Sequence, residues 1–130
     1  PDEHELLEVT MSKEPLGPLT GNNDSAWFDT VKWVTYALIE AEELGLTAEN
    51  IESTGESTED PNIKRFVGAE GTLGTDMGLP NDFAMRAVKA VGNYGEIYER
   101  NLGSESQFNL PRGQNALWND GGLLYSPPFR

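Results

Sequence analysis

The chain contains no cysteine and a single histidine, His4. The absence of thiols excludes disulfides, thiolate zinc sites and cysteine nucleophiles. His4 stands in a terminal segment that we expect to be solvated, so neither a Ser-His-Asp triad nor a histidine-rich metal site has support. No calcium-loop spacing occurs either. We therefore predict no metal site and no cofactor.

Long apolar runs are also missing, and none approaches the roughly 20 residues that a membrane-spanning helix needs. Leu, Ile, Val and Phe together number 29 of 130 residues, which is close to the composition of disordered chains. The length fits one domain. We expect a folded chain with a modest core, one that leaves room for a partner to complete it.

Basic residues are scarce: 9 Lys and Arg stand against 22 Asp and Glu, for a formal charge of -13. The balance is -4 over residues 1–20, -9 over residues 21–60 and zero over residues 61–130. Such a chain repels phosphate backbones, so we predict no nucleic-acid partner. The acidic block reads as a solvated helix end followed by a polar loop, rather than as a cation site.

The clearest predicted helix spans residues 27–44. Asp24 or Ser25 is positioned to cap it, and Gly45 ends it. Its apolar side chains recur at helical spacing and cover a broad face, so we expect contacts on more than one side and a place in the core. The stripe consists of Trp27, Val31, Val34, Leu38 and Ala41, widened by Phe28, Trp33, Tyr36 and Ile39.

A second helical pattern runs from Asn81 to Gly103, with Asn81 or Asp82 as its cap. Gly103 is predicted to close it in a left-handed conformation. Gly92 and Gly95 lie inside the pattern, and each costs up to about 1 kcal/mol relative to Ala. Either the helix breaks there, or another backbone packs closely against it. The stripe is Phe83, Ala87, Val88, Val91, Tyr94, Tyr98 and Leu102.

The signals between these helices are weaker. Residues 47–51 could open a short helix, and residues 53–60 read as a mobile polar loop. Residues 60–68 carry a cap, Pro61 at the first helical position and a Gly stop, which predicts a short helix. Residues 70–79 contain three glycines and are predicted to wrap over the surface as a loop.

Both ends are predicted to be extended. Pro15 and Pro18 make residues 5–20 an edge strand or a connector. Residues 111–120 could form one or two helical turns. Residues 123–130 cannot be helical because they contain two consecutive prolines, and we expect this aromatic tail to pack across the body.

Carboxylate pairs are the only residues that suggest catalysis, since a glycosidase needs two acids in a cleft. An ordinary charged helix face explains Glu96 and Glu99 beside Arg100 better. A small hydrolase is thus the weakest hypothesis, and we predict no enzyme. The segment from Gly71 to Gly74 is too short for a phosphate-binding loop. The pairs are Glu42/Glu43, Glu59/Asp60 and Glu96/Glu99.

Five segments in order carry a family resemblance. They are SKEPLGP (12–18), DSAWFDTVKW (24–33), VGNYGEIYERNLG (91–103), RGQNALWNDGGL (112–123) and YSPPFR (125–130). Together they resemble the C-terminal third of the polar amino-acid solute-binding proteins of ABC transporters, in the general L-amino-acid branch. Residues 46–80 match least well, as an insertion would.

The resemblance implies the α/β fold of type II periplasmic binding proteins, with two lobes joined by a hinge, of which this part is mainly helical with a few short extended segments. Residues 1–20 would form the hinge or crossover segment. Residues 21–103 would form the C-terminal helical part of the first lobe, with an insertion at about 46–80, and residues 104–130 a C-terminal extension. The resemblance also favours the break at Gly92-Asn93, where the last helix of that lobe would begin.

The hinge-like residues would be Ser12, Lys13, Glu14 and Pro15. The family's principal ligand contacts, an Arg and an Asp, are expected in upstream segments that this sequence does not contain, so no ligand-binding residue can be assigned. The opening Pro1 and the lack of a signal sequence suggest the interior of a longer protein, or a processed or trimmed one.

The implied partners are an L-amino acid in the full-length protein and an ABC permease, and the implied location is the periplasm. Alone, the chain is not expected to bind ligand, and a homo-oligomer could cover its exposed apolar surface. The alternative is an independent helical protein-interaction module without a transport role.

Overall fold

The computed structural model describes residues 7, 9, 11, 12 and 14–129. Its helices, in order, are α1 (Ser25–Glu43), α2 (Ile51–Ser57), α3 (Pro61–Phe66), α4 (Leu73–Asp76), α5 (Phe83–Val91), α6 (Tyr94–Asn101) and the 3₁₀ turns η1 (Gly113–Asn115) and η2 (Trp118–Asp120). Within the described residues no strand forms, and one isolated bridge pairs Leu117 with Leu124. The prediction of a mainly helical chain is confirmed.

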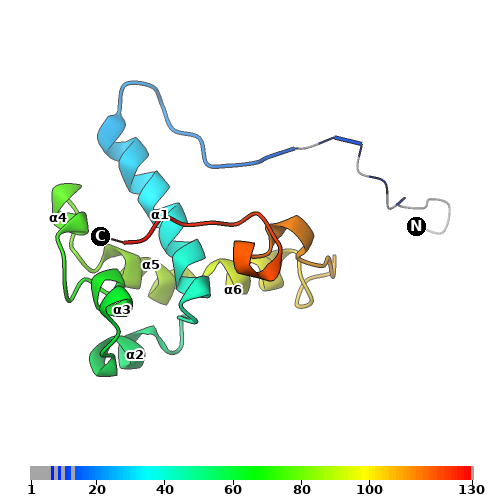
Figure 1. The fold of residues 1–130 in the computed structure, drawn as a ribbon. Helices are drawn as coiled ribbons and strands as arrows, with labels where there is room; N and C mark the ends of the chain where they lie inside the picture. Colours follow the sequence, from blue (N-terminus) through cyan, green and yellow to red (C-terminus); the bar gives the residue numbers. More distant parts are fainter. Residues whose placement is uncertain (1–6, 8, 10, 13, 130) are drawn as a thin grey trace.

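Helix α1 begins and ends where its sequence predicts. The Asp24 side chain accepts a hydrogen bond from the Trp27 backbone amide at 3.0 Å, and Gly45 follows the helix with a left-handed φ of 67°. The C-terminal half of α1 packs against α5 and α6. Its N-terminal half rises clear of the other helices (Figure 1).

The predicted core role of the whole aromatic stripe of α1 is therefore wrong at its first turn. Trp27 is 54 % exposed and Phe28 is 52 % exposed. The buried residues of this helix are Ala37, Ile39 and Ala41, all in its C-terminal half. The periodicity identified the apolar face, but periodicity does not tell how far the covering elements extend along it.

The pattern over residues 81–103 breaks into α5 and α6, as the resemblance implied. Gly92 has φ 79°, and Asn93 caps α6 in a reciprocal box with Glu96. The left-handed cap predicted at Gly103 is wrong, because α6 ends at the cap residue Leu102 and Gly103 is not among the residues of positive φ. The chain turns there instead through a hydrogen bond from the Ser104 amide to the Glu99 carboxylate at 2.9 Å.

The segment between α1 and α5 is more ordered than predicted. Residues 53–57 belong to α2, so the predicted mobile loop over 53–60 is wrong. Thr47 and Asn50 exchange backbone-to-side-chain hydrogen bonds ahead of this helix, and Ile51 is fully buried. The helix predicted after Pro61 is confirmed as α3. The predicted loop over 70–79 contains the one-turn helix α4.

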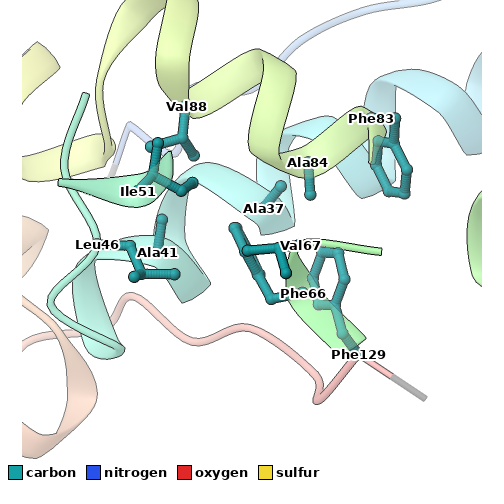
Figure 2. Packing of buried hydrophobic residues seen from close by; sticks show 10 residues of the cluster. All are labelled: Ala37, Ala41, Leu46, Ile51, Phe66, Val67, Phe83, Ala84, Val88 and Phe129. Carbon is teal, nitrogen blue, oxygen red and sulfur yellow. The ribbon is translucent and has the colours of Figure 1, made fainter. Parts of the chain in front are cut away.

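The core lies between α1, α5, the α2–α3 region and the C-terminal tail. Phe129 reaches in from the tail beside Phe66, with ring centroids 5.1 Å apart (Figure 2). The prediction that the tail packs across the body is thus confirmed. The cluster consists of Ala37, Ala41, Leu46, Ile51, Phe66, Val67, Phe83, Ala84, Val88 and Phe129.

None of the helices in the described part of the chain is both long and apolar enough to cross a membrane.

Candidate functional site

Of the predicted hinge residues, Ser12, Glu14 and Pro15 belong to the arm, by which we mean the described residues up to 23 that precede α1 and its cap. The arm extends away from the body (Figure 1). The Ser12 hydroxyl donates to the Glu14 carboxylate at 3.0 Å, and Glu14 and Pro15 are exposed. Lys13, like His4, lies outside the described residues. Among the described arm residues, no side chain reaches the helical body through a hydrogen bond.

The carboxylate pairs considered for catalysis hold the fold together instead. Glu96 accepts the amides of Asn93 and Ala48, so it fastens α6 to the turn that follows α1. Glu99 accepts the Ser104 amide and hydroxyl, which lower the pKa of its carboxyl. This arrangement gives neither acid a free role as a proton donor or nucleophile.

In the other two pairs, Glu43, Glu59 and Asp60 are likewise bound to partners within the fold. The Glu43 carboxylate accepts the Trp118 indole N–H at 3.2 Å. Glu59 pairs with Lys64 at 2.8 Å, and Asp60 caps α3 by accepting the Asn62 amide.

Two further acids, Glu52 and Glu56, line an open depression of about 490 Å³. Glu52 pairs with Lys89 at 2.9 Å. Among the residues that the structure describes, no three His, Cys, Asp or Glu side chains converge as metal ligands.

Arg112 is the centre of the best-connected polar cluster. Its guanidinium binds both oxygens of Glu42, at 2.8 and 3.0 Å. It also lies 5.6 Å from the Tyr94 ring centroid and 5.1 Å from that of Tyr98. A bidentate, partly buried pair of this kind is geometrically specific. It ties residues 111–116 to α1 and α6, so its role is structural.

Glu40 carries the most perturbed acid in the described chain. Burial raises the pKa of its carboxyl to about 7 from the usual 4.5, the Glu43 carboxylate adds to the rise, and the Ser126 hydroxyl offsets part of it. Perturbed acids are frequent at active sites. Glu40 does not line the groove between the arm and α1 or the two depressions of about 650 and 490 Å³, and Ser126 of the tail is itself buried.

The remaining candidate is a set of apolar side chains on the arm and on the N-terminal half of α1, which we call the α1–arm face. Its members are Leu16 and Leu19 of the arm and Trp27, Phe28 and Val31 of α1. A groove of about 210 Å³ lies in the corner between the arm and α1, lined by Pro18, Thr20, Phe28, Val31, Lys32, Thr35 and Tyr36.

Sequence reasoning missed Arg112, because no local signal links it to an acid 70 positions away. It also missed the role of Asn93, whose buried side chain donates to the Leu46 carbonyl at 2.8 Å. The spacing from Asn93 to Glu96 is that of a capping box, and this signal was present in the sequence.

The sequence is similar to three curated proteins along essentially its whole length. It is 53 % identical to the general L-amino acid-binding periplasmic protein AapJ of Rhizobium johnstonii, over all of this chain and 38 % of that protein. It is 50 % identical to the glutamate/glutamine/aspartate/asparagine-binding protein BztA of Rhodobacter capsulatus, over 96 % of this chain and 37 % of that protein. It is 44 % identical to the putative amino-acid ABC transporter-binding protein YhdW of Escherichia coli K12, over 100 % of this chain and 38 % of that protein.

The fold is also similar to that of a solved periplasmic binding protein. An ABC transporter periplasmic binding protein from Brucella ovis, solved with glutathione bound, superposes with a TM-score of 0.94 at 46 % identity, over 99 % of this chain and 40 % of that one. No family model matches the sequence. The chain spans 38 % of the length of the first curated relative. By sequence and by fold, this chain belongs, as a segment of that length, to the amino-acid-binding periplasmic proteins of ABC transporters.

Proposed function

We propose that this chain is the C-terminal portion of a periplasmic protein that captures L-amino acids for an ABC importer, and that it does not bind ligand alone. The observation that carries the proposal is identity of 44–53 % along the whole chain to binding proteins of which it spans little more than a third. Such identity, with a TM-score of 0.94 to a solved member, supports a shared role for the complete polypeptide.

The arrangement of polar groups supports the second half of the proposal. An amino-acid site needs a cation for the α-carboxylate and an acid for the α-amino group. Arg112 is saturated by Glu42, two ring faces and the Asn115 carbonyl. The groove in the corner of the α1–arm face offers Lys32, which is paired with Asp29 at 2.7 Å. Neither cation is prepared for a free ligand.

The domain division remains part of this proposal. Residues 1–20 would cross between lobes, with Ser12, Lys13, Glu14 and Pro15 at the hinge. Residues 21–103 would complete the first lobe, and residues 104–130 would be an extension that Arg112 and Phe129 fasten to it. The extended, exposed form of the described arm supports the first assignment.

The names of the relatives support a proposal for the substrate and the partner. The names of two relatives specify L-amino acids in general and the acidic amino acids with their amides, so we propose L-amino acids as ligands of the complete protein. An ABC permease would be its partner, and the periplasm its location. No enzymatic activity is proposed.

Calorimetric titration of the 130-residue chain with a panel of L-amino acids tests the proposal. We expect no saturable heat for any of them. Tight binding by this chain alone, with a stoichiometry near one, would overturn it.

A further inference from the structure

The C-terminal tail, residues 123–129, crosses α1 without forming a helix, and we call it the strap (Figure 1). Leu123 and Leu124 donate backbone hydrogen bonds to residues 114 and 116 of the same extension. Residues 125–129 make no backbone–backbone hydrogen bond with another described residue. This part of the strap is therefore held by its side chains, so the loss of one contact weakens its attachment substantially.

Two of these side chains are buried. Phe129 is 6 % exposed, and its ring lies 5.1, 5.3 and 6.1 Å from those of Phe66, Trp33 and Phe83. Ser126 is 4 % exposed and faces the half-buried Glu40 of α1. The strap thus has one apolar attachment, in the core, and one polar attachment, on the helix that it crosses.

The polar attachment depends on a single hydroxyl proton. The Ser126 hydroxyl is in hydrogen-bonding contact with the Glu40 carboxyl, and it also donates to the Pro127 carbonyl at 3.0 Å. One hydroxyl proton serves one of these acceptors at a time. An ionised Glu40 only accepts and so competes with Pro127, whereas a protonated Glu40 can donate its own proton to the Ser126 oxygen. The protonated form therefore satisfies all three groups under the closed strap.

The neighbours of Glu40 do not compensate its negative charge. Burial, and then the Glu43 carboxylate three positions along α1, raise the pKa of the Glu40 carboxyl. In the strap, Tyr125 is the single titratable side chain of residues 123–129. Arg112 of the extension is bound to both oxygens of Glu42, at 2.8 and 3.0 Å.

The charged groups of the two helices packed on α1 are also engaged. On α5, Arg86 and Lys89 are both in ion pairs. On α6, Arg100 donates to a backbone carbonyl, and the acids are bound as described above. Arg130 lies outside the described residues. No cation that the structure describes therefore stabilises an ionised Glu40 beneath the strap, and exposure to water favours its charge.

We propose that residues 123–129 are a proton-controlled strap, which lies closed over α1 while Glu40 is protonated and is released when Glu40 ionises. Release lets water reach the Glu40 carboxylate and withdraws Ser126 and Phe129 from their buried positions. This inference goes beyond the proposed function and does not depend on it, because all the groups involved lie within this chain.

The direction of the pH dependence follows from the pKa of Glu40. Its value of about 7 beneath the strap lies above the usual 4.5, so the closed strap binds the proton more tightly than the open one. The proton's contribution to closure is fully present below pH 4.5 and is lost as the pH rises through 7. With allowance for the partial exposure of the side chain, we expect the ratio of open to closed strap to rise at least about fivefold between pH 5 and pH 8.

The absence of cysteine allows the opening to be measured directly. Ser126→Cys places a thiol at a buried position of the strap, Leu123→Cys at a position that is 72 % exposed, and Val88→Cys in the core away from Phe129 (Figure 2). Each is introduced singly into the 130-residue chain, with and without Glu40→Gln. Labelling by iodoacetamide is followed from pH 5 to pH 8, and division by the rate at position 123 removes the pH dependence of thiol chemistry.

We expect the normalised rate at position 126 to rise at least fivefold from pH 5 to pH 8, and to exceed the rate at position 88 at pH 8. Glu40→Gln should abolish this rise. A rate that does not change with pH, or the same rise in the Glu40→Gln background, would overturn the proposal. Equal rates at positions 126 and 88 at every pH would also overturn it, because the chain would then open as a whole.

A titration of the unaltered chain is an independent measurement, since Ser126→Cys changes the strap itself. Carboxyl ¹³C NMR, with the Glu40 signal identified by its loss in Glu40→Gln, should give a midpoint near pH 7. Phe129→Ala, in a chain that circular dichroism shows to remain helical, should move the midpoint toward 4.5. Glu43→Gln is the control and should lower it less. A midpoint near 4.5 in the unaltered chain, or one that Phe129→Ala leaves in place, would contradict the proposal.

Discussion

At the scale of single residues, the polar side chains of this chain act on structure. Glu42, Glu96 and Glu99 each accept at least two hydrogen bonds from other parts of the chain. No buried side-chain nitrogen or oxygen among the described residues lacks a hydrogen-bond partner. Acids that are bound in this way tie elements together, and their carboxylates are held by structural donors.

Substitution of Arg112 tests most directly whether these polar contacts stabilise the fold. Arg112→Ala should lower the free energy of unfolding by about 2–3 kcal/mol, because it leaves the partly buried Glu42 carboxylate without its partner. Arg112→Lys should recover only part of the loss, since an ammonium group cannot bind both oxygens in the same plane. Urea unfolding followed by circular dichroism measures both.

The control is Lys32→Ala, which removes the partly exposed pair with Asp29 and should cost less than about 1 kcal/mol. If Arg112→Ala costs no more than this control, the cluster around Arg112 does not hold the extension.

Glu40 makes stability depend on pH. Its folded-state pKa of about 7 lies above its usual value of 4.5, so the folded chain binds the proton more tightly than the unfolded chain does. The resulting stability is present below pH 4.5 and is lost as the pH rises to 7. Glu40→Gln should therefore stabilise the chain at pH 8 by about 1 kcal/mol, after allowance for the partial exposure of the side chain, and by little at pH 4.5.

Thermal unfolding across this pH range measures the effect. Glu49→Gln, at an exposed acid in the turn between α1 and α2, is the control. A gain at pH 8 no larger than that of the control would show that burial does not penalise the Glu40 carboxylate.

At the scale of elements, local signals determined most of what could be predicted. The caps at Asp24 and Asp60, the stop at Gly45 and the break at Gly92 all depend on neighbouring residues, and the structure confirms them. Helix α2 was missed because Ser, Thr and Gly dominate it. It forms because Ile51 is buried in the core, and such long-range packing overrides local propensity.

For the candidate site, too, local features could be predicted from the sequence and long-range contacts could not. The apolar stripe of α1 was visible in the sequence, whereas the exposure of its first turn depends on where α5, α6 and the tail end. The long-range pair of Arg112 and Glu42 likewise needs the fold. The hinge assignment came from the family resemblance and stays a prediction.

The turn at Gly92 tests how the α5–α6 break is fixed. A Cβ at this position would lie 2.9 Å from the Glu96 Cβ, in a backbone conformation with φ 79° that L-residues avoid. Gly92→Ala should therefore cost about 2–4 kcal/mol, because the backbone strain adds to a disturbed capping box. Chemical denaturation gives the value.

Gly71→Ala is a matched control, since Gly71 has φ 84° with nothing within 4 Å of an added Cβ. This variant should cost only the strain, about 1–2 kcal/mol. Equal losses for the two variants would mean that contact with Glu96 contributes nothing to the turn.

At the scale of the whole molecule, the chain is a folded segment with an uncovered side. Its core is continuous from α5 to Phe129 (Figure 2), while the arm and the free half of α1 extend from it (Figure 1). Apolar side chains are exposed on the arm and on the first turn of α1, and the chain spans 38 % of the length of the first relative. Under the proposed function, the ligand-binding residues belong to the remainder of the polypeptide.

The most direct measurement is a calorimetric titration of two samples with the same L-amino acids: the 130-residue chain alone, and the chimera in which it replaces the matching segment of the Rhizobium johnstonii protein. The account predicts no binding by the chain, and binding by the chimera with a Kd within about tenfold of that of the Rhizobium protein, a difference of at most about 1.4 kcal/mol. Binding by the chain alone, or a folded chimera that binds none of the amino acids recognised by the Rhizobium protein, would contradict it.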